Sequence, residues 1–136
     1  MNIWIICSKA FYGKIAEIKN ILESYGHEVT LPNSYYHPEM ETEAWNRSSE
    51  DHVKFKQEMF RLSRKTAESV DAALVLNYEK HGTPNYIGGA TFLEIYEAFC
   101  NDKKIFFMND IPQGILFDEL QGIDPTVIHG DLSLIK

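Results

Sequence analysis

Residues 71–94 read DAALVLNYEKHGTPNYIGGATFLE. The run from Ala72 to Leu76 is short, continuous and apolar, which is typical of a parallel strand buried on both faces. The paired glycines Gly88 and Gly89 follow, and a stretch with helical spacing of its apolar residues begins near Thr91. A strand that leads through a loop into a helix is the building unit of α/β folds with parallel sheets.

Similar units occupy the rest of the chain. Further short apolar runs, which predict strands, occur at residues 2–7, 27–31, 104–108 and 125–128. Helical spacing predicts helices at residues 11–25 and 51–70, the latter capped near Ser48 or Ser49, and a helical turn at residues 114–121. We therefore predict an α/β fold: one doubly wound, Rossmann- or flavodoxin-like domain over residues 1–136, with a five-stranded parallel sheet in the order 2-1-3-4-5.

Composition narrows the class of partner. The chain has 136 residues and a formal net charge of −7, which argues against a nucleic-acid polymer because Lys and Arg bind phosphate backbones. No apolar run approaches the length of a membrane span, and Met1 leads into an apolar strand without a signal-peptide pattern. Cys7 and Cys100 both lie in apolar stretches, so we do not expect a disulfide framework. We expect a cytoplasmic protein without a membrane partner.

The sequence carries no motif for a bound cofactor. Its glycine-rich loop lacks the dinucleotide fingerprint and the ending of a P-loop, so neither NAD nor nucleoside triphosphate binding is supported. The five histidines show neither helical i,i+4 pairing nor clustering with cysteines. We expect no cofactor and no metal site.

Residues 33–50, NSYYHPEMETEAWNRSSE, have no clean helical or strand period. A structureless segment of this length in a compact domain is usually a lid, a binding loop or a disordered excursion. We interpret it as a flexible flap, with plain surface disorder as the alternative. The sequence does not decide whether such a flap closes over a ligand.

The predicted topology locates a binding crevice outside the carboxyl ends of the strands, where strands one and three diverge. The segments that face it are residues 7–12, 77–91 and 108–112, whereas Asp71 lies at the opposite end of its strand and is expected to be structural. The candidate substrate-binding residues in these segments are Ser8, Lys9, Tyr12, Asn77, Tyr86, Gly88, Gly89 and Thr91.

These candidates have simpler alternatives. Ser8 and Lys9 suit a sugar hydroxyl or a phosphate, but they are equally typical of a turn serine and a surface lysine. Tyr12, Tyr78 and Tyr86 suit hydrogen bonding or stacking on a base, although a buried aromatic ring most often only packs.

The helix predicted at residues 51–70 carries a run of positive residues: Lys54, Lys56, Arg61, Arg64 and Lys65. Such a run is usually a solvated helix face. The alternative is that one of these residues contacts a phosphate, and Arg61 and Arg64 are the first candidates.

Glu94 has two interpretations. Thr91 and Glu94 have the T-x-x-E spacing of a capping box, in which both side chains satisfy amides of the first helical turn. The functional alternative is a carboxylate beside the crevice that attacks an electrophilic carbon, kept ionised by the helix N-terminus as a nucleophile must be. Gly88 and Gly89 offer backbone that approaches a ligand closely and adopts positive φ.

These stretches resemble the nucleoside 2-deoxyribosyltransferase-like superfamily. Residues 71–77, NYIGGATFLEI from Asn85, Ala98 and DKKIF from Asp102 follow the family's order of strand, glycine-rich loop, helix with the catalytic Glu, alanine and turn into the next strand. The opening IICSKAFYGKIAEIKNILESYGHEV resembles the family's first β-α-β unit, so the similarity spans most of the chain. The glycine loop is also similar, more weakly, to that of the nucleoside-monophosphate phosphoribohydrolases.

The resemblance implies a nucleoside or nucleotide N-glycosidic-bond enzyme, either a deoxyribosyltransferase or an N-hydrolase. Glu94 would displace the base from the anomeric carbon, and a second base or water would resolve the glycosyl-enzyme, as in retaining glycoside hydrolysis. The partner would be a small-molecule nucleoside or nucleotide. The resemblance also implies a homo-oligomer, a dimer or higher, for which the apolar stretch at residues 111–117 is a candidate interface or, alternatively, a cover for the last strand.

The chain departs from the family's pattern at two acidic positions. The loop from Asn85 to Gly89 has no acid, and a gapless count places Ser63 or a neighbour where the family carries an Asp on the helix before strand three. For the leaving-group acid, Asp110 after strand four is the first candidate and Glu79 the second, although turns favour Asp in any case. The alternative function is a noncatalytic nucleotide-binding or sensing domain of the same fold.

Overall fold

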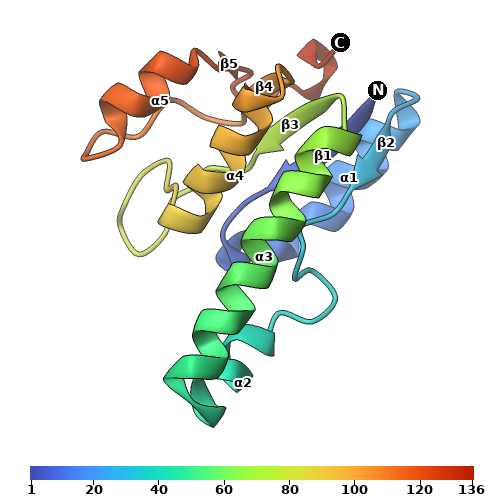
Figure 1. The fold of residues 1–136 in the computed structure, drawn as a ribbon. Coiled ribbons are helices and arrows are strands. Elements are labelled where there is room, and N and C mark those ends of the chain that lie inside the picture. The colour runs from blue at the N-terminus through green and yellow to red at the C-terminus, as the bar shows by residue number, and fades with distance from the viewer.

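A computed structural model describes all residues 1–136 and shows a five-stranded sheet with helices on both faces (Figure 1). The strands are β1 (Asn2–Ile6), β2 (Glu28–Thr30), β3 (Ala72–Val75), β4 (Lys104–Phe107) and β5 (Thr126–Val127). All neighbouring pairs are parallel, and the order is β2-β1-β3-β4-β5. The predicted doubly wound α/β fold and its strand order are confirmed.

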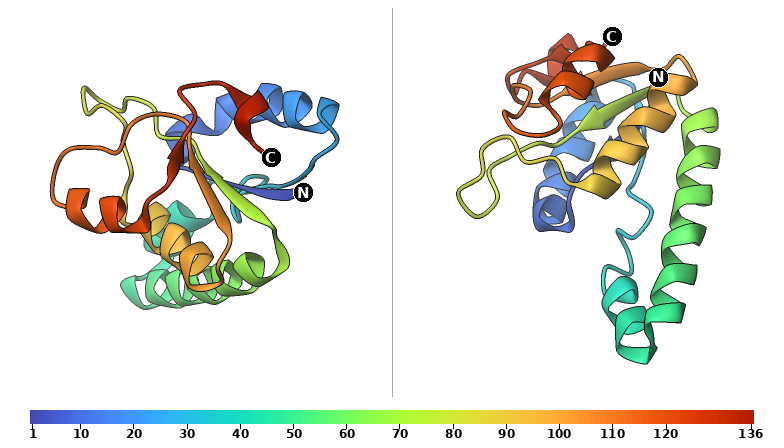
Figure 2. Two further views of the ribbon diagram at one scale, coloured as in Figure 1. Left: turned by 90° about the horizontal axis from the view of Figure 1, so that it is seen from above. Right: turned by 60° about the vertical axis from the view of Figure 1, so that its left-hand side comes forward.

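The helices form one layer on each face of the sheet (Figure 2). They are the 3-10 helices η1 (Lys9–Lys14) and η2 (Leu132–Leu134), and the α-helices α1 (Ile15–Ser24), α2 (Met40–Arg47), α3 (Ser49–Ser69), α4 (Gly89–Cys100) and α5 (Phe117–Ile123). One core cluster joins the sheet to η1, α1 and η2, and a second joins it to α3, α4 and α5.

Strand β1 shows why a continuous apolar run predicts a central strand. Successive side chains of a strand point to opposite faces of the sheet. Ile3 and Ile5 belong to the cluster on the α1 face, and Trp4 and Ile6 belong to the cluster on the α3 face. All four side chains are fully buried. Each such burial contributes about 1.5–3 kcal/mol, so the strand is stabilised from both faces.

Asp71 ties the amino ends of β1 and β3 together. Its Oδ2 accepts a hydrogen bond of 2.7 Å from the backbone N–H of Asn2. The contact lies at the end of the sheet opposite to the predicted crevice. This agrees with the structural role that the sequence predicts for Asp71. The carboxyl ends of the two strands stay available for a ligand.

Helix α2 and the N-terminal half of α3 form an arm that extends beyond the sheet (Figures 1 and 2), whereas the C-terminal part of α3 packs on the sheet through Ala67. The start of α3 agrees with the prediction, because the Ser48 hydroxyl accepts a hydrogen bond of 3.0 Å from the Asp51 N–H. The expectation of a segment without regular structure at residues 33–50 is wrong in part, because α2 lies within it. Only Ala44 of α2 is buried, so this helix leaves almost no apolar period in the sequence.

The apolar stretch at residues 111–117 divides between two environments. Ile111 and Leu116 pack against the core cluster on the α4 face, whereas the side chain of Ile115 is 96% exposed. Part of the stretch therefore covers the sheet, as one of the two interpretations requires, and its role as an interface stays a prediction. None of the helices combines the length and the apolar character needed to cross a bilayer.

Candidate active site

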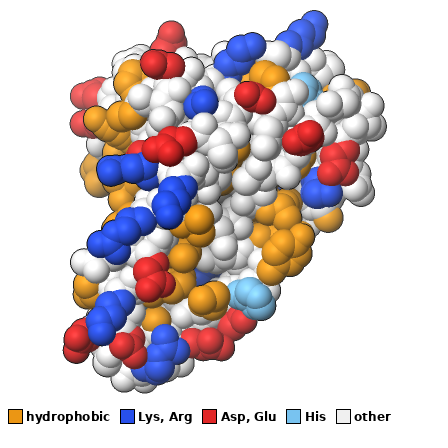
Figure 3. Space-filling model, turned by 45° about the vertical axis from the view of Figure 1, so that its right-hand side comes forward, with side chains coloured by type: hydrophobic (Ala, Val, Ile, Leu, Met, Phe, Trp, Pro, Cys, Tyr) orange, Lys and Arg blue, Asp and Glu red, His pale blue; other side chains and the backbone are white.

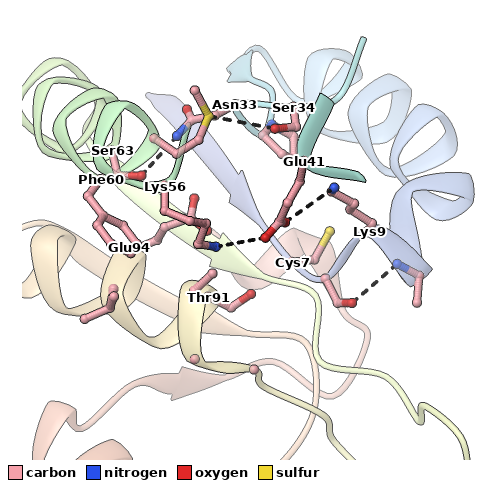
Figure 4. A pocket seen from close by; sticks show the side chains of 18 of the residues that line it. Cys7, Lys9, Asn33, Ser34, Glu41, Lys56, Phe60, Ser63, Thr91 and Glu94 are labelled. Atoms are coloured by element: carbon pink, nitrogen blue, oxygen red, sulfur yellow. Dashed lines mark hydrogen bonds and ion pairs between the residues drawn. The ribbon is translucent and has the colours of Figure 1, made fainter. Parts of the chain in front are cut away.

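A cavity of about 700 Å³ opens at the carboxyl end of β1, between the arm and the start of α4 (Figure 4). Its lining comes from the end of β1 and η1, the segment that leads into α2, one face of α3 and the first half of α4. This is the side of the sheet on which a ligand is expected in a doubly wound fold.

The cavity brings together most of the residues that the sequence singled out. They are Ser8, Lys9, Tyr12, Tyr86, Gly88, Gly89, Thr91 and Glu94. The two remaining candidates, Asn77 and Asp110, are absent from its lining.

Helix α4 begins earlier than the capping-box interpretation requires. Its N-cap is Gly88 and its first residue is Gly89, so Thr91 is the third residue of the helix and Glu94 lies in the second turn. No side chain caps the helix. The capping-box interpretation of Thr91 and Glu94 is therefore wrong: Thr91 is buried in the helix, and Glu94 is free for another role.

The carboxyl group of Glu94 is partly buried in the cavity and pairs with no other side chain. Loss of water around it raises its pKa from 4.5 to about 8, against the opposing effect of the Lys56 charge. The effect of a helix N-terminus falls off within the first turn, so it does not offset this loss in the second turn. The expectation that the helix keeps Glu94 ionised is thus wrong for the ligand-free site.

Gly88 and Gly89 matter because they lack a side chain, and not because they adopt an unusual backbone conformation. Neither has a positive φ, contrary to the expectation for this pair. A Cβ atom on Gly88 would lie 2.9 Å from the Tyr86 hydroxyl, so a side chain there would displace that ring. A Cβ atom on Gly89 would meet nothing within 4 Å. The glycines therefore let Tyr86 approach the start of α4 and leave the cavity open beside it.

The segment after β1 supplies a second group of polar side chains. The Ser8 hydroxyl accepts a hydrogen bond of 3.4 Å from the Ala10 N–H, which starts η1, and one of 3.3 Å from the Lys80 ammonium. Lys80 also lies 4.6 Å from the centre of the Tyr86 ring. Lys80 thus joins the loop after β3 to the end of β1 at the cavity.

Cys7 and Tyr12 lie in the electrostatic field of Glu94. Burial, followed by the Glu94 charge, raises the pKa of the Cys7 thiol to about 12. Burial, followed by Cys7 and Glu94, raises the pKa of the Tyr12 phenol. Both groups therefore stay protonated at neutral pH, and the Tyr12 hydroxyl is a hydrogen-bond donor in the cavity.

The wall opposite Glu94 is built around Glu41 of α2. Its carboxylate lies 3.6 Å from Lys9 Nζ and 3.6 Å from Lys56 Nζ (Figure 4). Its Oε2 also lies 2.8 Å from His52 Nε2. Burial acts to raise the pKa of Glu41, but the hydrogen bond with His52 and the charges of Lys56 and Lys9 outweigh it and lower the pKa. Glu41 is therefore an ionised carboxylate at neutral pH.

Ser63 confirms that the helix before β3 contributes to the cavity. It lies on α3, is 6% exposed, and its hydroxyl accepts a hydrogen bond of 3.0 Å from Asn33 Nδ2. The gapless count from Asp71 thus identified a position that lines the cavity. Because a hydroxyl stands there, α3 brings no acid to this point.

Asn77 and Asp110 lie outside the cavity for different reasons. Asn77 is fully buried, and its amide Nδ2 donates to the carbonyls of Asn109 (3.0 Å) and Asp110 (2.9 Å), so its side chain clamps the ends of β3 and β4. The Asp110 side chain is 72% exposed and lies 3.7 Å from His129. The structure therefore supports neither Asn77 as a substrate ligand nor Asp110 as the leaving-group acid.

The positive residue of α3 that reaches the cavity is Lys56. Arg61 is exposed, and exposed Arg64 lies 3.4 Å from Glu97. On the face in Figure 3, Lys and Arg side chains follow one another along the arm, as a solvated helix face does. Arg61 and Arg64, the first candidates from the sequence, do not line the cavity.

The sequence did not identify Glu41 and Lys80 as site residues, and it indicated Lys56 only as one member of the positive run on the helix at residues 51–70. Phe55 and Ser63 are buried on α3 and mark the stripe that faces the body of the protein. Lys56 adjoins that stripe, whereas Arg61 lies on the opposite side. Glu41 left no comparable signal, because its helix has no apolar period.

Comparison with solved structures identifies a protein of the same fold, whereas no family model and no curated protein matches the chain. A CMP N-glycosidase from Clostridium botulinum, BcmB, superimposes with a TM-score of 0.53 and 14% sequence identity. The match covers 94% of this chain and 86% of that chain. At this identity the likeness establishes a shared fold, and the shared fold includes nearly all of the chain described above.

Proposed function

We propose that the protein is an N-glycosidic-bond enzyme acting on nucleosides or nucleotides, with Glu94 as the nucleophile. The observation that carries the proposal is a carboxyl group without a side-chain partner inside a cavity at the carboxyl end of the sheet. Tyrosine and lysine side chains surround that cavity. The fold shared with a CMP N-glycosidase and the resemblance of the glycine loop support the same reaction class.

The proposed reaction has two steps. The Glu94 carboxylate forms a bond to the anomeric carbon while the bond from that carbon to the base nitrogen breaks, and the base leaves with the electron pair and takes up a proton from water. Water then attacks the glycosyl-enzyme and gives the free sugar, or a second base attacks and gives an exchanged nucleoside. Both outcomes use the same intermediate, so the first step defines the function.

Glu94 must lose its proton before it attacks. Its pKa of about 8 leaves roughly one molecule in ten ionised at pH 7. Lys56 is the cation that already favours the ionised form. The tyrosines at residues 12 and 86 would contact the base or the sugar, with their hydroxyl groups as donors.

The direct test is to trap the intermediate. A panel of deoxynucleosides, ribonucleosides and their 5′-monophosphates is incubated with the protein, and released base is measured by chromatography. Samples quenched in acid are digested with trypsin, and the peptide of residues 81–103 is examined by mass spectrometry. We expect base release together with a glycosyl mass increase on that peptide, which fragmentation assigns to Glu94 rather than to Glu97.

Glu79→Gln is the matched control for Glu94→Gln. Glu79 is an exposed carboxylate in the loop after β3 and does not line the cavity. We expect base release to survive this substitution and to be lost in Glu94→Gln. Full activity in Glu94→Gln, or no base release from any member of the panel, would contradict the proposal.

A noncatalytic nucleotide-binding domain is the second candidate. The protonated state of Glu94 in the ligand-free site favours it, as does the lack of a carboxyl group at residues 85–89, directly before and at the start of α4. A ligand that binds only the folded state raises the melting temperature, so a thermal-shift screen with the same panel detects binding without turnover. Stabilisation by nucleotides without base release would favour this candidate over the enzyme.

A further inference from the structure

The carboxylate of Glu41 occupies a position that is unusual for a surface glutamate. It projects from α2 into the cavity, where its Oε1 lies 3.6 Å from Lys9 Nζ and its Oε2 lies 3.6 Å from Lys56 Nζ. His52 Nε2 completes the group at 2.8 Å from Oε2. Two lysines and one histidine, from the two elements η1 and α3, therefore converge on one anion.

The two lysines reach this point from fixed parts of the fold. Lys9 follows the central strand β1, and Lys56 lies one residue from the buried Phe55 on α3. Glu41 comes instead from a short helix of which only Ala44 is buried. The anion is therefore the least firmly held member of the group, and the two cations are the site that it occupies.

The charges favour a particular replacement for Glu41. Glu41 balances only one of the two lysine charges, and Glu94 is held mainly in its neutral form, so the cavity keeps a local positive charge within a chain of net charge −7. A free carboxylate would bring the same single charge, but Glu41 is tethered and therefore at high effective concentration. A phosphate monoester carries close to two negative charges at neutral pH. It would therefore interact more favourably with the two lysines than Glu41 does, whereas a ligand with a single charge would not.

We propose that Lys9 and Lys56 form the subsite for a phosphate monoester on the sugar, and that Glu41 occupies this subsite in the free protein until the phosphate displaces it. The proposal rests on the proposed function, since it specifies that the nucleotide, rather than the nucleoside, is the preferred ligand. Displacement of Glu41 frees α2 from its contacts with Lys9 and Lys56. The segment leading into α2 is then the part of the cavity wall that responds to the ligand.

The test measures binding of ribose 5-phosphate and of ribose by isothermal titration calorimetry at pH 7.5. Glu41→Gln keeps the shape of the side chain and removes the charge that competes with the ligand. We expect its Kd for ribose 5-phosphate to fall about three- to tenfold below that of the unmodified protein, because the subsite is no longer occupied. The Kd for ribose should not change. Lys9→Met and Lys56→Met should each weaken ribose 5-phosphate binding about fivefold or more.

Two control variants make the same charge changes on the same helices. Glu43→Gln removes an exposed carboxylate of α2, and Lys54→Met removes an exposed ammonium of α3; neither residue lines the cavity. Both should leave the Kd within twofold of that of the unmodified protein. Circular dichroism melts confirm that each variant is folded before its Kd is compared.

Trp45 gives an independent readout of the displacement. Its ring stacks on His52 at 3.9 Å between centroids, so it neighbours the residue that holds Glu41. Ribose 5-phosphate should change the tryptophan emission, and Trp45→Phe should abolish the change because the other tryptophan, Trp4, is buried in the core. Emission that stays constant at saturation would show that the Glu41 contacts persist, and would contradict the displacement.

The proposal is overturned if Glu41→Gln binds ribose 5-phosphate no more tightly than the unmodified protein, if ribose binding tightens equally, or if no variant binds the phosphate. Because ribose 5-phosphate contains no base, this measurement does not depend on bond cleavage. Binding as predicted without base release from any substrate would overturn only the proposed function. Base release without any effect of Glu41→Gln on phosphate binding would overturn only this inference.

Discussion

Two walls of one cavity treat the same functional group in opposite ways. On the α4 wall, Glu94 pairs with no side chain, and loss of water raises its pKa to about 8. On the α2 wall, burial also acts on Glu41, but His52, Lys56 and Lys9 reverse its effect and lower the pKa. The difference teaches that partners, and not depth alone, set the charge of a carboxyl group in a protein.

Lys56 connects the two walls. Its ammonium lies 3.6 Å from the Glu41 carboxylate, and its charge also opposes the rise in the Glu94 pKa. Paired carboxyl groups whose surroundings separate their pKa values are a recurrent arrangement in active sites. At neutral pH Glu94 is thus mainly a carboxylic acid and Glu41 a carboxylate, and the predictions below test whether that asymmetry matters.

The largest difference should come from making the same substitution on each wall. With a nucleoside that carries no phosphate, Glu94→Gln should lower the rate of base release on the order of 10³-fold or more, because the amide is not a nucleophile. Glu41→Gln should stay within about tenfold of the unmodified protein, since Glu41 forms no bond in the proposed reaction. Steady-state assays of released base measure both. Equal losses in the two variants would mean that the walls do not differ in function.

The pH dependence of kcat/KM should follow the ionisation of Glu94. A nucleophile acts as its carboxylate, so with a pKa of about 8 the active fraction falls about tenfold for each pH unit below that value. We expect kcat/KM to rise about 50-fold between pH 6 and pH 8 and then to level off. A profile that instead declines above pH 8 would show that Glu94 acts as an acid, and would refute its role as nucleophile.

Removing the bridging cation should shift that profile. Lys56→Met deletes the positive charge that favours ionised Glu94, so the midpoint of the pH profile should move upward by about half a unit and the rate at pH 7 should fall about threefold. Lys54→Met is the matched control, because Lys54 is exposed and pairs only with Glu50 on the same helix. A midpoint that does not move in Lys56→Met would show that Lys56 does not act on Glu94.

The smallest effect should come from the acid that lies outside both walls. Asp110→Asn should leave base release within about twofold, since this exposed side chain lies beside His129 and not in the cavity. The assay and substrate are those used for Glu94→Gln. A large loss of kcat with unchanged stability would return Asp110 to the site and require a conformation in which the loop after β4 turns toward the cavity.

The fold followed from the sequence because its evidence is local. Runs such as residues 72–76 are apolar at every position, and a strand must be buried on both faces to tolerate this. Their alternation with helical periods leaves few topologies open. The predicted start of α4, near Thr91, was less accurate. The N-cap Gly88 and the first helical residue Gly89 have no side chain that could cap the helix, so the sequence shows no signal at its true start.

The site was predictable only where it follows from strand order. Ser8, Lys9 and Tyr12 follow β1, and Glu94 lies on the helix after β3, so the rule for doubly wound sheets brings them to one crevice. The same rule brought Asp110 to that crevice, but the buried Asn77 side chain binds the backbone at Asn109 and Asp110 and holds that loop in another direction. Sequence position alone does not contain such a contact.

The sequence by itself determined the sheet, its order and the presence of Glu94 near the carboxyl end of the strands, because hydrophobic periods and chain connectivity specify these features. Only the tertiary structure decided the charge of the two walls. The pKa of Glu94 depends on the water that the folded chain excludes, and that of Glu41 depends on cations from distant segments, residues 9 and 56. Burial and long-range pairing exist only after the chain has folded, so no local pattern records them.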